Sequence, residues 1–158
     1  MYFTRLEFMN ESPEKVESLL LVLPSIWTSI DLSSQAGPAF LNLLTTIGCD
    51  IPEAPYILES LIEDLENYPT SFRLQLLNST VTLFLHRPAE CRGILSKLFK
   101  SSINPTETLD VRERALFLYL LLQHDIEKVC QFIINGFNRF TTSFGYLIYL
   151  NLLLIRLG

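Results

Sequence analysis

The sequence predicts an all-α protein built from short helices. Apolar residues recur at steps of three and four along most of the chain, which is the period of a helix with one buried face. Strict alternation of apolar and polar residues, which would indicate strands, is almost absent. Of the 158 residues 49% are apolar and 18% are charged, so the chain can bury one core without disulfides or metals.

The first two expected helices are bounded by proline and glycine. Ser12 can cap a helix that begins at Pro13, and Pro24 should kink or end that helix. The second helix is expected over residues 38–47, because Gly48 is a common helix stop. The residues expected on the buried faces of these helices are Val16, Leu19, Leu20, Leu23, Phe40, Leu43, Leu44 and Ile47.

Three further helices are expected in the middle of the chain. Two cover residues 54–66 and 70–85, and the third begins at Pro88 and is closed by Asn104-Pro105. Glutamates occupy the outer face of the first of these, opposite its leucines. The apolar residues at helical spacing in the three segments are Leu58, Leu61, Ile62, Leu65, Leu74, Leu77, Val81, Phe84, Cys91, Leu95, Leu98 and Phe99.

Aspartates mark the starts of the last two expected helices. Asp110 can cap the sixth helix, and Asp125 can cap a seventh that Asn135-Gly136 ends. The apolar residues at helical spacing in these two segments are Val111, Ala115, Leu118, Leu122, Ile126, Val129, Cys130 and Ile133.

The regular spacing of these segments indicates how they pack. The expected helix starts fall at positions 38, 54, 70, 88, 109 and 125, so one helix follows another at nearly even steps. Pairs of helices therefore recur with a period typical of helical-repeat proteins, which is roughly 35 residues. Helices this short are marginal alone, but stacked antiparallel pairs can bury a continuous core. We therefore expect an α-solenoid of the armadillo or HEAT type, with about seven or eight short antiparallel helices, and a compact seven-helix bundle with the same local pattern is the alternative.

Charge is distributed unevenly along the chain. Residues 1–66 carry 11 acids and 2 bases, residues 67–158 carry 6 acids and 10 bases, and the total is −5, which disfavours nucleic acid as the main partner. The fifth expected helix carries four cations, which are Arg87, Arg92, Lys97 and Lys100. They could form a basic patch that contacts an acidic partner or an anionic membrane, and the alternative is a helix face exposed to solvent. In the sixth helix Arg112 and Arg114 oppose the helix dipole, so we expect carboxylates such as Asp110 and Glu113 to compensate them, with a partner contact as the alternative.

No catalytic, cofactor or metal motif is recognisable. The three cysteines, Cys49, Cys91 and Cys130, lack metal-ligand spacing, and the two histidines, His86 and His124, have no nucleophile or ligand set around them in sequence. Glycine-rich phosphate loops and hydrolase motifs are absent. We therefore expect no enzyme, no cofactor and no metal, and the odd cysteine count together with an amino terminus unlike a signal peptide favours an intracellular protein.

Three segments in order resemble one protein family. They are IPEAPYILESLIEDLE at 51–66, LFLHRPAEC at 83–91 and LDVRERALFLYLLLQHDIEKV at 109–129. Together they resemble the C-terminal part of the helical trunk of the β-adaptins, the large β subunits of adaptor-protein complexes. The strings APYILE, RPAEC and RERALF are most similar to the β subunit of the fourth adaptor complex. The string VRERA alone is less specific, because coatomer γ subunits carry a similar one.

The resemblance covers about residues 26–130 and implies a non-catalytic scaffold. Such trunks belong to heterotetrameric coat complexes that sort cargo into vesicles at the trans-Golgi network and endosomes, so it implies a cytoplasmic protein that is peripheral on those membranes. The implied partners are the longin-like domain of the medium subunit and the second large subunit. The matching positions, which become interface candidates, are Tyr56, Pro88, Arg112, Glu113 and Arg114. The alternatives are an independent helical-repeat protein-binding module and a coatomer-type coat subunit.

The last part of the chain does not resemble the family. We expect residues 1–130 to form an adaptin trunk-like helical-repeat domain and residues 131–158 to form an apolar C-terminal segment. From Phe144 to Leu157 there are 14 residues, 11 of them apolar, which is too short for a membrane span of about 20 residues. This segment could cap the open end of the solenoid, attach to a membrane interface, or be a terminus foreign to the family. The upstream repeats, linker and appendage of a β-adaptin have no counterpart in this sequence.

Overall fold

The computed structural model describes residues 13–124, which form six α-helices and three short 3-10 turns without a strand. The expectation of an all-α fold is confirmed. The expected seventh helix, the Ser12 cap and the apolar segment 131–158 lie outside these residues. The helices are α2 (Pro13–Ile26), α3 (Ala36–Ile47), α4 (Ala54–Glu63), α5 (Thr70–His86), α6 (Pro88–Ser102) and α7 (Leu109–His124), and the turns are Trp27–Ser29, Gly48–Asp50 and Leu65–Asn67.

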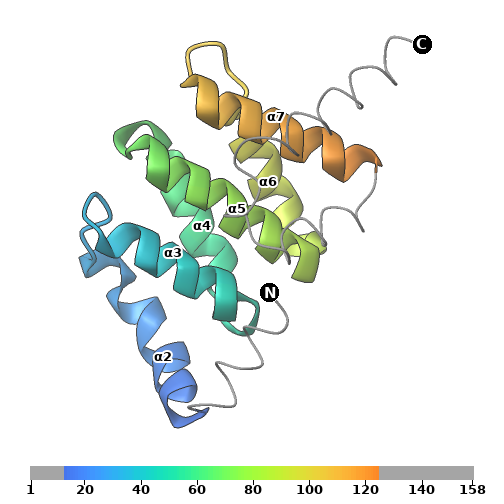
Figure 1. Ribbon diagram of the computed structural model, residues 1–158. Coiled ribbons are helices and arrows are strands. Elements are labelled where there is room, and N and C mark those ends of the chain that lie inside the picture. The colour runs from blue at the N-terminus through green and yellow to red at the C-terminus, as the bar shows by residue number, and fades with distance from the viewer. Residues whose placement is uncertain (1–12, 125–158) are drawn as a thin grey trace.

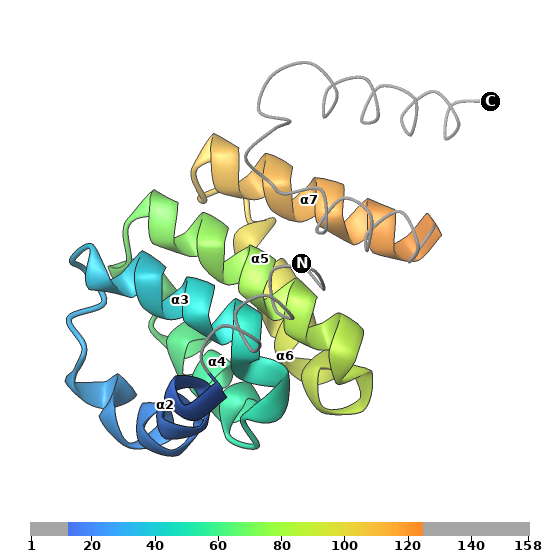
Figure 2. The ribbon, with the colours of Figure 1, turned by 60° about the horizontal axis from the view of Figure 1, so that its bottom comes forward.

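The helices from α3 onward form two layers. Helices α3, α5 and α7 lie side by side in one layer, and α4 and α6 lie in the other (Figure 1). Each helix packs along the helix two places further on, so α3 contacts α5, α4 contacts α6, and α5 contacts α7. The view in Figure 2 shows the same order from another side. This is the arrangement of an α-solenoid, as the spacing predicted.

Polar contacts between neighbouring repeats measure the repeat length directly. The hydroxyls of Thr45 and Ser79 lie 2.6 Å apart, and the Gln75 amide donates to the side-chain oxygen of Asn42 at 2.5 Å. These contacts join α3 to α5 across 34 and 33 residues of sequence. The sequence separation between equivalent positions of neighbouring repeats therefore agrees with the period expected from the spacing of the helix starts.

Helix α5 lies at the centre of the core and is buried on several faces. It packs against α3, α4, α6 and α7, and the side chains of Phe72, Leu76 and Leu77 are fully buried. The buried hydroxyls of Thr80 and Thr82 donate to the carbonyls of the preceding turn at 2.8 Å, which satisfies them without a partner helix. The largest fully buried side chains within residues 13–124 are Leu41, Ile47, Ile51, Leu58, Leu61, Phe72, Leu76, Leu77, Val81, Leu98, Val111 and Leu118.

Several helix boundaries differ from the sequence expectation. Helix α2 continues two residues past Pro24, so this proline does not end it. Helix α3 begins at Ala36 rather than Pro38, because proline is tolerated in a first turn. Asp110 is not the cap of α7 but lies in its first turn, where the N–H of Arg112 already donates to the Thr108 carbonyl at 3.0 Å.

The expected helix over 54–66 is divided in two. Helix α4 ends at Glu63, and Leu65–Asn67 form a separate 3-10 turn that keeps Leu65 buried. Within residues 13–124, none of the helices is both long and apolar enough to cross a membrane.

Two glycines in helices provide a matched test of packing. A Cβ on Gly37 would lie 2.2 Å from the backbone oxygen of Leu32, whereas a Cβ on Gly93 would meet nothing within 4 Å. We expect Gly37→Ala to lower the free energy of unfolding by about 1–3 kcal/mol, because backbone must move. The matched control Gly93→Ala should raise it by about 0.5–1 kcal/mol through helix propensity. Urea unfolding of the full chain followed by circular dichroism measures both, and equal effects would contradict the packing at Gly37.

Candidate functional site

Arg87 is a structural cross-link at the start of α6. Its Nη1 donates to the Ile51 carbonyl at 2.7 Å and its Nη2 to the Pro52 carbonyl at 3.3 Å, while its Nε donates to Glu90 Oε1 at 2.9 Å. The hydrogen bonds with Glu90 raise the pKa of Arg87 and lower that of the Glu90 carboxyl. The guanidinium therefore ties the first turn of α6 to the segment before α4, one repeat earlier.

Lys97 is paired across the same layer. Its ammonium forms an ion pair with the Glu59 carboxylate of α4, and this hydrogen bond raises the pKa of Lys97. Both side chains are exposed to solvent, so the pair contributes little to stability. Arg87 and Lys97, two of the four cations expected in a basic patch, therefore bind other residues of this chain.

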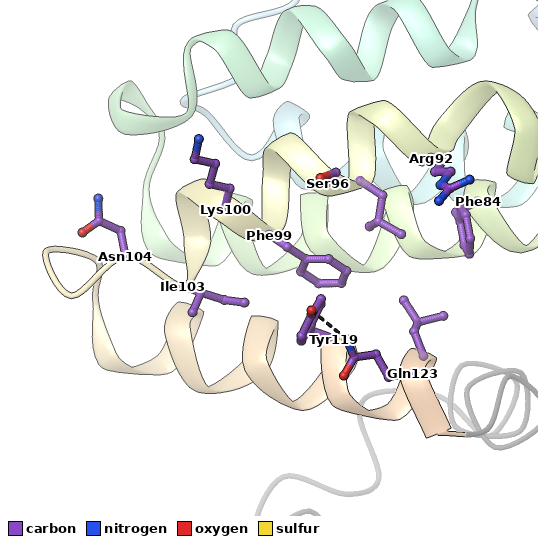
Figure 3. Close-up of a pocket in the computed structure, with 11 residues that line it drawn as sticks. Phe84, Arg92, Ser96, Phe99, Lys100, Ile103, Asn104, Tyr119 and Gln123 are labelled. Atoms are coloured by element: carbon purple, nitrogen blue, oxygen red, sulfur yellow. Dashed lines mark hydrogen bonds between the residues drawn. The ribbon is translucent and has the colours of Figure 1, made fainter.

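The other two cations remain available on the surface of α6. Arg92 and Lys100 are exposed, and neither has an ionic partner among residues 13–124. Both line a groove of about 810 Å³ between α6, α7 and the end of α5 (Figure 3). The full lining is Phe84, Arg92, Leu95, Ser96, Phe99, Lys100, Ile103, Asn104, Tyr119, Leu122 and Gln123.

The ion pair of Arg73 with Glu107 was missed by the sequence analysis. Glu107 precedes α7 and its side chain is 8% exposed, while Arg73 in the first turn of α5 is 17% exposed. Arg73 Nε also donates to the Tyr68 carbonyl at 2.9 Å, and Glu107 Oε1 accepts the Thr108 N–H at 2.7 Å. Arg73 and Glu107 are 34 residues apart in the sequence, which is the length of one repeat. A search for opposite charges at this separation could have predicted the ion pair.

The environment of Glu107 favours its charged form. Burial by itself would raise the pKa of this carboxyl, but hydrogen bonds from the Thr108 N–H and from Arg73 outweigh burial and lower it. A carboxylate held in this way fixes the loop between α6 and α7 against the start of α5.

The five interface candidates lie on two opposite edges of the stack. Tyr56 and Pro88 are exposed near the starts of α4 and α6, which Arg87 holds side by side. Residues 112–114 lie at the start of α7, which the Arg73–Glu107 pair holds beside the start of α5. Because α4 and α5 are consecutive and antiparallel, these two places are at opposite ends of the helices (Figure 1). Tyr56 is 73% exposed, whereas Arg114 is half-buried and burial lowers its pKa.

The described residues were compared with what a metal site or a reactive cysteine requires. Within residues 13–124 there is no group of three or more His, Cys, Asp or Glu side chains that could hold a metal ion. Cys91 is buried in the core, and burial raises the pKa of its thiol to about 11. Since the thiolate is the nucleophile and the metal ligand, Cys91 is suited to packing rather than chemistry.

The fold and its contacts define a class of protein, a segment of an α-solenoid whose repeats are joined by polar cross-links. Comparison with curated proteins then identifies the family. Over 121 residues, 75% of this chain, the sequence is 36% identical to AP-4 complex subunit beta-1 of Mus musculus. It is 29% identical over 121 residues, or 76% of the chain, to Beta-adaptin-like protein A of Arabidopsis thaliana. It is 27% identical over 119 residues, or 75% of the chain, to AP-1 complex subunit beta-1 of Homo sapiens.

The chain therefore belongs to the β-adaptins, as the three sequence blocks indicated. Identity is higher to the AP-4 subunit than to the AP-1 subunit, which confirms the expected similarity to the fourth complex. The aligned part spans only 16%, 14% and 12% of these three relatives. No family model and no solved structure matches the chain.

The Arg73–Glu107 pair should stabilise the fold measurably. Glu107→Gln keeps the shape but removes the charge, so we expect the free energy of unfolding to fall by about 1.5–3 kcal/mol, as for hydrogen bonds to charged groups. The matched control is Glu59→Gln at the exposed pair with Lys97, which should leave stability almost unchanged. Urea unfolding at pH 7 compares the two variants, and equal losses would show that Glu107 has no special role.

The same pair makes stability depend on pH in a defined direction. The folded-state pKa of Glu107 lies below its unfolded value. Its contribution is therefore complete above the unfolded value of about 4.3 and is lost as pH falls through the folded value. We expect the stability difference between wild type and Glu107→Gln to be constant from pH 7 to 5 and to shrink at lower pH. Urea midpoints measured across this range test it, and a difference that grew on acidification would contradict the assignment.

Proposed function

We propose that this chain is a non-catalytic scaffold segment of a heterotetrameric adaptor complex in vesicle-mediated intracellular protein transport. The observation that carries the proposal is the 36% identity to an AP-4 complex β subunit along 75% of the chain. Because the aligned part is 16% of that relative, the role proposed is that of one stretch of repeats within a larger assembly surface.

The geometry supports a scaffold because its repeats are held in register. The contact between Thr45 and Ser79 joins α3 to α5. The ion pair of Arg73 with Glu107 joins the start of α5 to the segment before α7, and the hydrogen bond from Arg87 to the Ile51 carbonyl joins α6 to the segment before α4. A stack fixed in this way presents long edges of constant shape, on which another subunit can bury a large area.

The proposed partners are the longin-like domain of the medium subunit and the second large subunit. Two separate edges with candidate residues suit two partners. On one edge Tyr56 is a large side chain that is 73% exposed, which is typical of an interface anchor. On the other edge Arg112 and Glu113 are available for polar contacts that fix orientation.

The proposed location is cytoplasmic and peripheral on trans-Golgi or endosomal membranes, reached through the complex. The similarity to β subunits of adaptor complexes supports a non-catalytic role.

Affinity purification tests the proposal. We expect the tagged full chain to retain the medium and second large subunits of an adaptor complex from its own cells, identified by mass spectrometry. Tyr56→Ala should reduce that recovery about tenfold, because it removes an exposed anchor. The matched control Tyr119→Ala changes a tyrosine on another face and should retain both subunits. Recovery of chaperones alone by a chain with native circular dichroism would overturn the proposal.

A further inference from the structure

Helix α6 has one face that is exposed along most of the helix. Ala89, Gly93, Lys97 and Lys100 follow one another at steps of four, four and three residues, so they share this face, and all four are exposed. The buried residues of α6 lie on its other faces, where the helix packs on α4, α5 and α7. These four positions are called the outer face of α6 below.

Gly93 is unfavourable in α6 unless another backbone approaches it. It is the sixth of the 15 residues of the helix, and apart from proline glycine is the least favourable residue in a helix interior. Glycine is suited to positions where another chain must come close. At Gly37 the backbone of Leu32 does so, whereas a Cβ on Gly93 would meet nothing within 4 Å. The element for which Gly93 leaves room is therefore not among residues 13–124.

The cations around Gly93 determine which charge an occupant should carry. Arg92 precedes Gly93, Lys100 lies about two turns further on, and neither has an ionic partner among residues 13–124. Figure 3 shows the Lys100 side chain pointing away from α7. The nearby carboxylate of Glu90 is already paired with Arg87, so it does not compensate these two cations. An occupant of the outer face should therefore carry carboxylates.

The shape of the outer face favours a helix as the occupant. Ala89 and Lys100 are 11 residues apart in the sequence, which is about 16 Å along the axis and suits a helix of about three turns. A second helix can approach closely where the side chains are small, as at Ala89 and Gly93. The four positions include no large apolar side chain that could insert between lipids, so an acidic protein helix fits this face better than an anionic membrane.

We propose that the outer face of α6 binds an acidic helix of a partner protein, whose backbone approaches at Gly93 and whose carboxylates pair with Arg92 and Lys100. These two cations are eight residues apart, about 12 Å along α6, so carboxylates about two turns apart on the partner helix meet both. The two ion pairs set the orientation of that helix. In taking the partner to be another subunit of the complex, the inference rests on the proposed function.

Photo-cross-linking of the full chain in its own cells tests the proposal. Ala89→p-benzoylphenylalanine places a photoreactive side chain on the outer face, and the matched control places it at Ala39, an exposed alanine of α3. Mass spectrometry of the purified tagged chain maps the cross-linked peptide. We expect the probe at residue 89 to label a helix of another adaptor-complex subunit that carries carboxylates about two turns apart. The probe at residue 39 should label that helix at least about tenfold less.

Three variants of the residue-89 probe chain separate docking from folding. Gly93→Leu should lower the cross-linking yield about tenfold, because it holds the partner backbone away, while the urea midpoint does not fall, because the position is open. Lys100→Ala should lower the yield about fivefold through the lost ion pair. The matched control Lys97→Ala should leave the yield unchanged, because Lys97 is already paired with Glu59.

The possible failures of this inference and of the proposed function are distinguishable. An unchanged yield for Gly93→Leu, or equal effects of Lys97→Ala and Lys100→Ala, would overturn the inference. Labelling of the same chain, of a second copy or of lipid alone would also overturn it. Recovery of the medium and second large subunits without a residue-89 cross-link would overturn the inference and leave the proposed function in place. Labelling of an acidic helix in a protein outside the adaptor complexes would support the docking chemistry and contradict the proposed function.

Discussion

The structure depends on the burial of each short helix from α3 onward against the next helix in the chain and against the helix two places away. A helix of 10 to 17 residues gains too little from its own hydrogen bonds to persist alone, so its apolar face must be covered by tertiary packing. Helix α5 shows this most clearly, because α3, α4, α6 and α7 all contact it. Removal of any one layer member would expose core residues of its two neighbours, so the repeats are stable only as a stack.

Polar cross-links then set the register that apolar packing leaves open. Hydrophobic contact is non-directional, whereas the Arg73–Glu107 pair and the Thr45–Ser79 hydroxyl contact require particular positions on both elements. Arg87 adds a third link by binding the Ile51 and Pro52 carbonyls. These links explain how a chain that belongs to the β-adaptins can offer edges of fixed shape without a catalytic centre.

Both ends of the described stack expose apolar side chains. At one end α2 exposes Leu21, Val22 and Ile26, and at the other the α6–α7 groove exposes Tyr119. Exposed apolar side chains of this kind are expected on the outer faces of a helical repeat, because each face is built to receive a neighbour. In the middle of the stack the equivalent faces are covered, as α6 covers α4.

The sequence by itself determined the all-α class, the starts of α4, α5 and α6, the regular recurrence of helix pairs and the β-adaptin relationship. These follow from local periodicity, from proline and glycine at helix ends, and from residue strings. Only the tertiary structure decided that α2 passes Pro24, that Asp110 lies inside α7, and that Arg87 and Lys97 are engaged while Arg92 and Lys100 line a groove. The physical reason is the sequence separation of the contacts. A helix start is encoded within one turn of chain, whereas the contacts that assign a role to a charged side chain join residues 34 to 38 apart.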